Sequence, residues 1–240
     1  MDYRKAILGL ILVTLISCET TEIMMDKMYL KEIKDPTCYI DQFEYEGERL
    51  ISYKRLFGER VATITKFIYE SNQLKTIEIK SDNGQDYTIE LSYGSNGLRD
   101  KEIRTLKQGE VESVTTTDFY YDENNNLKLK HISYTDPNFH SSETEFVWAK
   151  GNIIKRNYFY IDSQYNRKFS FSEDLLFDNK RNYTNQDIAF IYTGLYDELV
   201  LSKNNLILKD NTFEYNKSGY PISYKYSIDN KVYPVEMKYE

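Results

Sequence analysis

The chain has 240 residues and a formal net charge of −7, with 38 acidic and 31 basic side chains. This charge argues against a nucleic-acid partner, because binding to phosphates relies on Lys and Arg side chains. The sequence contains 23 tyrosines and 12 phenylalanines but only 10 glycines and 4 prolines. Aromatic residues fit pleated, half-buried surfaces, so the composition favours an all-β fold.

Residues 1–17 have the pattern of a signal peptide. Arg4 and Lys5 form a short basic start, and residues 6–16 form an uncharged apolar segment. This segment is too short to cross a bilayer, which requires about 20 apolar residues. The rest of the chain contains no stretch of that length, so we expect a body held at a membrane surface.

The four residues Leu15-Ile16-Ser17-Cys18 resemble the lipobox of bacterial lipoproteins. The resemblance implies that the signal is removed before Cys18 and that acyl chains such as palmitate anchor this residue in the membrane. We therefore predict residues 18–38 to be the acylated anchor and linker, followed by a single domain over residues 39–240. Cys38 then has no disulfide partner and is predicted to be a small apolar residue.

The residues that follow Cys18 indicate where in the cell envelope the protein is anchored. Glu19 and Glu22 resemble the acidic export signal of Bacteroidota-type lipoproteins, and the Asp that resembles an inner-membrane retention signal is absent after Cys18. We expect lipid anchoring in the outer membrane, on its periplasmic face or on the cell surface.

A repeat runs through the predicted domain. Each copy has an apolar residue, any residue and an aromatic residue, then a short polar interval rich in Gly or Asn, and then another apolar or aromatic residue. Spacing i, i+2 is typical of strands, and Gly and Asn favour turns, so each copy is predicted to be a β-hairpin. The copies are FEYEGERL (43–50), FIYESNQL (67–74), LSYGSNGL (91–98), FYYDENNNL (119–127), FVWAKGNI (146–153) and FEYNKSGY (213–220).

Strict alternation between the copies predicts strands with one buried and one wet face. We expect Gly97 and Gly219 to occupy turns with positive φ. Pro221, which cannot donate to a ladder, should start a strand or lie at an edge. The residues predicted to share a buried face are Ile89, Leu91 and Tyr93 in one strand, and Tyr220, Ile222, Tyr224, Tyr226 and Ile228 in another.

The segments FYYDENNNLKLKHISY and FEYNKSGYPISYKYS resemble tyrosine-aspartate (YD, RHS-like) repeats, and more closely the YD-repeat-like lipoproteins of Bacteroidota, whose domain has no assigned function. The late segments FDNKRN (177–182) and SKNNLI (202–207) agree with this resemblance. Only the copy at 119 keeps a literal Tyr121-Asp122 pair. The resemblance implies a curved antiparallel meander of hairpin repeats, as an open sheet or half-barrel, and no particular activity.

The alternation ends between residues 184 and 203. Apolar residues there, including Tyr192, follow roughly helical spacing that Gly194 interrupts. We predict one short helix or long loop that crosses one end of the sheet. It is either a binding segment or an apolar plug.

Motifs for catalysis are absent from the sequence. It has no Gly-x-Ser-x-Gly, no phosphate-binding Gly-rich loop with Lys, no His-Glu-x-x-His and no Cys-x-x-Cys. His131 is expected on a strand and His140 in a loop. The acidic stretches 82–86 and 122–126 fit turn chemistry better than a calcium loop. We therefore predict no enzyme, no metal site and no cofactor.

The sequence leaves two kinds of function open. The first is a non-catalytic binding role at the cell envelope, in which exposed rings stack on a glycan, peptide or lipid. The alternative is a structural or assembly accessory of an outer-membrane complex, in which the aromatic residues form the core. The oligomeric state is left open. The residues proposed to stack on a ligand are Trp148, Tyr192, Tyr220, Tyr224 and Tyr226.

Overall fold

A computed structural model of the protein describes residues 27–36, 39–108, 111–185, 187–194, 197–207, 212–228 and 231–240. The predicted signal peptide (1–17), Cys18, most of the linker and Cys38 lie outside these residues. In the described part of the chain, no helix is both long and apolar enough to cross a membrane.

Fifteen of the described strands form one antiparallel sheet, which confirms the predicted all-β meander. From β12 to β1 each strand pairs with its neighbour in sequence, and β17, β16 and β15 then continue the sheet beyond β1. The sheet is open, with β12 and β15 as its two edges. Its strands are β1 (Leu30–Lys34), β2 (Tyr39–Glu46), β3 (Arg49–Phe57), β4 (Arg60–Glu70), β5 (Gln73–Ser81), β6 (Asp86–Tyr93), β7 (Arg99–Gln108), β8 (Val111–Tyr121), β9 (Leu127–Tyr134), β10 (Ser142–Ala149), β11 (Asn152–Ile161), β12 (Arg167–Asp174), β15 (Thr212–Tyr215), β16 (Pro221–Ile228) and β17 (Lys231–Tyr239).

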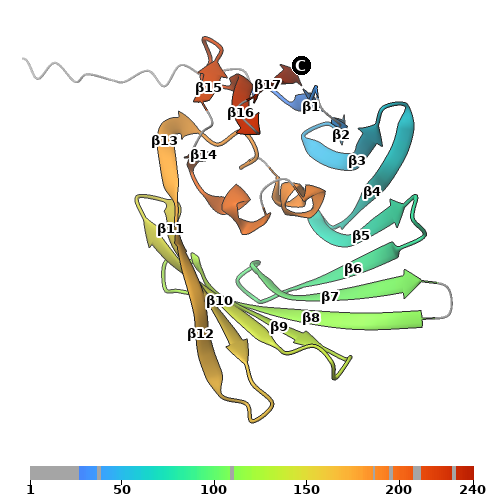
Figure 1. The fold of residues 1–240 in the computed structure, drawn as a ribbon, viewed down its shortest axis with the longest axis vertical. Coiled ribbons are helices and arrows are strands. Elements are labelled where there is room, and N and C mark those ends of the chain that lie inside the picture. The colour runs from blue at the N-terminus through green and yellow to red at the C-terminus, as the bar shows by residue number, and fades with distance from the viewer. Residues whose placement is uncertain are drawn as a thin grey trace, which may run out of the picture.

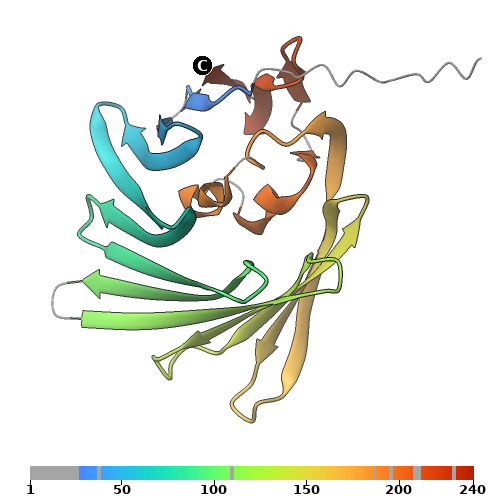
Figure 2. The ribbon, with the colours of Figure 1, turned by 180° about the vertical axis from the view of Figure 1, so that it is seen from behind.

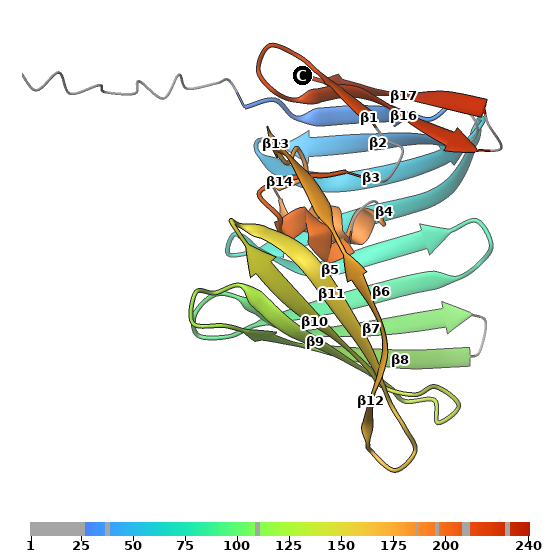
Figure 3. The ribbon, with the colours of Figure 1, turned by 60° about the vertical axis from the view of Figure 1, so that its left-hand side comes forward.

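The sheet curls around its own concave side (Figure 1). The view from behind shows the same curl, and the side view shows β11 and β12 running steeply across the direction of β1–β8 (Figures 2 and 3). This change of direction follows from the twist that accumulates between neighbouring strands.

The domain starts earlier than the sequence predicts. β1 pairs with β2 on one side and with β17 on the other, so it lies inside the sheet. Residues 30–34 therefore belong to the domain, and the predicted boundary at residue 39 is wrong. The sequence gives little indication of this strand, because LKEIK is rich in charged residues and does not alternate cleanly between polar and apolar residues.

The six repeat copies form hairpins, as predicted. Gly97 and Gly219 occupy turns at φ 76° and 77°, which confirms their predicted conformation. Four loops share one geometry: the first residue donates its N–H to the carbonyl of the fifth, and the fourth donates to the carbonyl of the first. The fourth residue has positive φ in each of them: Gly97, Asn125, Tyr165 and Gly219.

In four of the six repeats, the aromatic residue at the third position ties its hairpin to the preceding one. Its side chain donates a hydrogen bond to a backbone carbonyl at the start of the strand that follows the preceding turn. We call these bonds the aromatic ladder. They run from Tyr69 to Leu50 (3.0 Å), Tyr93 to Leu74 (2.7 Å), Tyr121 to Arg99 (2.8 Å) and Trp148 to Leu127 (2.7 Å).

The alternation predicted around Pro221 is only partly correct. Pro221 starts β16, as expected, and Tyr220 is buried. Ile222 is 41% exposed, although it was predicted on the buried face. The register between β15 and β16 shifts between Glu214 and Tyr215, opposite this part of β16, and such a shift disturbs the alternation of faces.

The described residues between 182 and 203, which we call the plug, lie on the concave side of the sheet (Figure 1). The described residues contain two short 3₁₀ helices, η1 (Ile188–Thr193) and η2 (Asp197–Leu201), where the sequence predicted a single helix or loop. A two-stranded sheet of β13 (Leu176–Arg181) and β14 (Asn204–Ile207) flanks the plug. The segment therefore packs against part of the concave face and does not cross an end of the sheet.

The plug divides the core into two clusters. In the larger cluster, Phe190 of η1 joins buried residues of β1–β6 and β17, and its ring lies 5.5 Å from that of Phe43. In the smaller one, Leu199 of η2 packs on residues of β8–β11. Asp187 connects η1 to the sheet, because its carboxylate accepts hydrogen bonds from Ala189 N and Leu50 N. It also lies 3.0 Å from the Tyr69 hydroxyl, which shares its one proton between Asp187 and the Leu50 carbonyl.

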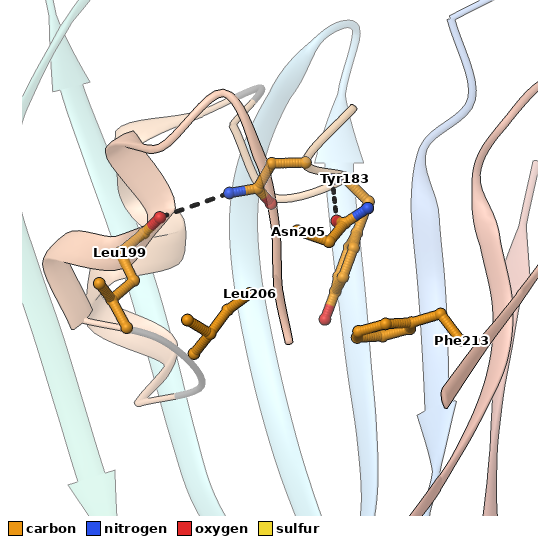
Figure 4. A pocket seen from close by; sticks show the side chains of 6 residues that line it. Tyr183, Leu199, Asn205, Leu206 and Phe213 are labelled. Atoms are coloured by element: carbon orange, nitrogen blue, oxygen red, sulfur yellow. Dashed lines mark hydrogen bonds between the residues drawn. The ribbon is translucent and has the colours of Figure 1, made fainter. Parts of the chain in front are cut away.

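Buried asparagines connect the plug to the small sheet. The side-chain amide of Asn182 donates to the carbonyls of Leu199, Val200 and Ser202. Tyr183 N donates to the side chain of Asn205, and Figure 4 shows this bond together with the ring of Tyr183, which lies beside that of Phe213. The void at this point has a volume of about 10 Å³, enough for about one water molecule and too small for a ligand.

Candidate functional site

A hollow of about 280 Å³ lies between the plug and strands β7, β8 and β9. Its floor combines threonine hydroxyls with apolar side chains, and charged groups line two of its sides. The lining residues are Glu102, Arg104, Thr115, Thr117, Phe119, Lys130, Ile132, Tyr134, Ile191, Tyr192, Asp197 and Glu198.

One side of the hollow rests on a buried arginine. Arg99 is 2% exposed, and its guanidinium lies 3.7 Å from the centre of the Phe119 ring. It donates to the hydroxyl of Tyr192, and that hydroxyl donates to Glu102 at 3.0 Å. Burial raises the pKa of Tyr192 well above its usual value, against the opposing effect of Arg99, so the ring stays a neutral phenol.

The other side is held by ion pairs from η2. Lys130 on β9 lies 2.8 Å from a carboxylate oxygen of Glu198. Burial alone would raise the pKa of Glu198, but Lys130 and Arg99 outweigh it and hold that pKa below its usual value. Arg156 on β11 donates to both carboxylate oxygens of Asp197, at 3.0 and 3.1 Å. These carboxylates are therefore engaged in holding the plug.

Arg104 differs from the other cations of the site. Its side chain is 46% exposed, and its contact with Glu102 is long, at 3.4 Å. Tyr134, at the end of β9, is 36% exposed and forms a ring pair with the more exposed Phe139. A guanidinium and an aromatic ring therefore face solvent at the mouth of the hollow, where a ligand could contact both.

The chain enters the domain at the opposite end. Lys27 forms an ion pair of 2.6 Å with Glu48 in the β2–β3 turn. The strands are antiparallel, so this turn lies at the end where β9 begins, whereas Tyr134 lies where β9 ends. A second, shallower groove of about 750 Å³ lies on the entry side and is lined by turn residues and by the strand ends beside them. We prefer the hollow because buried charges converge on it.

Among the residues predicted to stack on a ligand, Tyr192 is 7% and Tyr220 is 4% exposed, and both lie in the larger core cluster. Trp148 is half-buried and belongs to the aromatic ladder. Tyr224 and Tyr226 are half-buried and pack against the larger core cluster. The structure brings only Tyr192 to the hollow, as part of its wall. Stacking by the three half-buried rings stays a prediction.

The sequence reasoning missed Arg104, Lys130 and Tyr134. Each lies on a strand with ordinary alternation, so nothing marks it as a site residue until the plug is in place. Strands β7 and β9 do carry charged residues at positions that face the plug, and an inward-facing charge on a half-buried strand is the signal that would have revealed the hollow.

In the acidic turn at residues 122–126, the carboxylate oxygens already accept hydrogen bonds from the backbone of the same turn. The carboxylate of Asp122 accepts hydrogen bonds from the N–H groups of Asn124 and Asn126, at 2.9 and 2.8 Å. His131 contacts Glu143 at 3.2 Å. In the part of the chain that the structure describes, no three His, Cys, Asp or Glu side chains gather closely enough to hold a metal ion.

Comparison with known proteins gives a fold and no family. No protein-family model matches the chain, and no curated protein does so. A porin-like protein from Bacteroides vulgatus is similar in structure, with a TM-score of 0.52 and 14% identity over 89% of this chain and 99% of that one. A porin-like protein from Bacteroides uniformis has a TM-score of 0.48 and 12% identity, over 89% and 96% of the two chains. The first likeness, at this low identity, establishes a shared fold.

Proposed function

We propose that the protein is an outer-membrane lipoprotein with a non-catalytic binding role, and that its ligand occupies the hollow between the plug and strands β7–β9. The observation that carries this proposal is the uneven cover of the concave face. The plug buries part of that face, and beside it a hollow lined by Arg104, Tyr134 and threonine side chains stays open.

The lining favours a glycan or a peptide over a lipid. Hydroxyls and a guanidinium can hydrogen-bond sugar hydroxyls or peptide groups, and an aromatic ring at the mouth can stack on either. A volume of about 280 Å³ is at the lower limit for ligand sites, so it suits one unit of a chain that continues outside.

A binding role agrees with the state of the carboxylates. Glu198 is paired with Lys130 and Asp197 with Arg156, so both carboxylates have a structural role in holding the plug. The structural-accessory alternative draws support from a different observation. The tyrosines of the repeats form the aromatic ladder and the core, as that reading expects.

The position of the lipid anchor on Cys18 determines which way the mouth of the hollow faces. Eight residues lie between Cys18 and Lys27, and the nine steps of chain can span at most about 30 Å. A lipid on Cys18 would hold the entry end of the domain near the membrane. The mouth of the hollow, at the other end, then faces away from the membrane and is accessible to a ligand in solution.

Ligand binding can be followed through Trp148, the only tryptophan. Its side chain packs on the smaller core cluster, which includes Phe119 of the hollow. We expect one member of a panel of cell-surface glycan fragments and short peptides to shift its emission and to be recovered intact. Arg104→Ala should weaken this binding at least tenfold.

The matched control is Arg60→Ala, which removes a 72% exposed arginine outside the hollow and should leave affinity unchanged. Equal effects of the two variants would refute the site. A ligand that is converted to product would refute the non-catalytic role. A panel without any binder would favour the structural accessory.

The anchor has its own test. Cys18→Ala removes the thiol that the acyl chain needs, so we expect the protein to leave the membrane fraction or to stay unprocessed. Fractionation followed by mass spectrometry of the N-terminus would detect either result. A variant that is cut before residue 18 and still requires detergent would contradict lipid anchoring.

A further inference from the structure

Exposed apolar side chains gather at one edge of the large sheet. Among the described residues, the most exposed large apolar side chains include four in or beside β12, which are Tyr165 (90%), Leu176 (69%), Phe169 (60%) and Phe171 (54%). Single exposed apolar residues are ordinary, but a cluster of them indicates an interaction surface.

The backbone of β12 is free on one side. Within the described residues, β12 pairs only with β11, and the next strand, β13, pairs with β14 instead. A free edge exposes a row of N–H and C=O groups that can pair with another strand. β12 is longer than the other edge strand, β15, by eight residues to four.

Charges of opposite sign lie at the two ends of β12. Arg167 and Lys168 begin the strand, and Glu173 and Asp174 end it. Charged residues on an edge usually limit indiscriminate pairing. Arg167 already pairs with Glu143 and Glu145, and Glu173 with Arg156. An antiparallel second copy would add matches, with Arg167 opposite Asp174 and Lys168 opposite Glu173, whereas a parallel copy would place like charges together.

An irregularity in the sheet brings the matching charges to the same face. Lys168 lies opposite Tyr160 and Glu173 opposite Arg156, and both of these β11 residues share one side. In a regular strand, residues five apart lie on opposite faces. The register shift between β11 and β12 adds one residue, Ser170, to β12 and so restores the match.

We propose that two copies of the protein join edge to edge through β12, antiparallel about a two-fold axis. Each copy then presents the same strand to the other, as an isologous interface requires. The exposed Phe169 and Phe171 lie near the axis and are covered by the partner strand. The two concave faces become neighbours on one continuous sheet.

The first test measures the mass of the purified full-length protein in detergent by light scattering over a range of concentrations. We expect a dimer, and we expect Lys168→Glu to raise its dissociation constant at least tenfold by placing Glu opposite Glu173 twice. Lys168 is half exposed, and its ion pair with Asp162 is long at 3.9 Å, so this variant should fold normally.

The control is Lys66→Glu, which makes the same charge change on the exposed side of β4, inside the sheet. It should leave the dimer intact. A monomer at all concentrations, or equal effects of the two variants, would overturn the proposal.

The second test fixes the register. A chain carrying Lys168→Cys and Glu173→Cys, with Cys38→Ser, should form disulfide-linked dimers on oxidation. The two positions are about 16 Å apart along one strand, too far for a bond within a chain. Dimers that do not crosslink would refute this register and point to another surface.

Discussion

Replacing Phe190 by alanine should lower the free energy of unfolding by about 3–5 kcal/mol, the range for deleting a buried phenylalanine ring. Phe190 is 1% exposed and packs on the ring of Phe43 at 5.5 Å. It is the largest fully buried side chain of the plug, and its removal leaves a cavity between η1 and the sheet. Urea denaturation followed by circular dichroism would measure the loss.

A matched substitution tests whether burial is the cause. Phe139→Ala removes the same ring from a side chain that is 59% exposed, so it should change stability by less than about 1 kcal/mol. Similar losses for both variants would mean that the plug does not pack against the concave face as described.

Lys130→Met should lower stability by about 3 kcal/mol, because it leaves the carboxylate of Glu198 buried without its closest cation. Arg99 remains nearby and limits the loss to the lower part of the range for broken buried ion pairs. The double variant Lys130→Met/Glu198→Leu replaces both charges with apolar groups and should recover most of the loss. A double variant as unstable as the single one would contradict this account.

The same ion pair predicts a pH dependence. In the folded chain the pKa of Glu198 lies below its ordinary value of 4.5. A carboxyl group with a lowered pKa contributes stability that is fully present above its unfolded pKa and is lost as the pH falls through its folded pKa. As the pH falls below about 4.5, the wild type should therefore lose stability relative to the double variant, which has no carboxylate at this position. A constant difference down to pH 2 would contradict the ion pair.

Much of the fold could be predicted because the repeats are local. A hairpin needs only alternation on two strands and turn residues that tolerate positive φ, and Gly97 and Gly219 supply the latter at fixed places in the repeat. The meander then follows from joining hairpins in order. The pairing of β1 with β17 could not be predicted, because nothing in the sequence of LKEIK indicates that it pairs with a strand from the far end of the chain.

The aromatic residues show why the candidate site was harder to predict than the fold. A tyrosine at the third position of a repeat looks the same in sequence whether it stacks on a ligand or donates to a neighbouring carbonyl. Tyr93, which donates to Leu74 at 2.7 Å, does the latter. The hollow depends on contacts across long sequence separations, such as the pair between Lys130 and Glu198. Periodicity carries no information about such pairs.

The claim on which the function rests is that the plug covers only part of the concave face, and the accessibility of two threonines tests it most directly. Thr65 on β4 is 1% exposed and lies in the covered half, whereas Thr115 on β8 lines the hollow. In a Cys38→Ser background, Thr115→Cys should react with a water-soluble maleimide at least a hundredfold faster than Thr65→Cys under native conditions. Equal rates at the two positions would contradict an open hollow beside a seated plug.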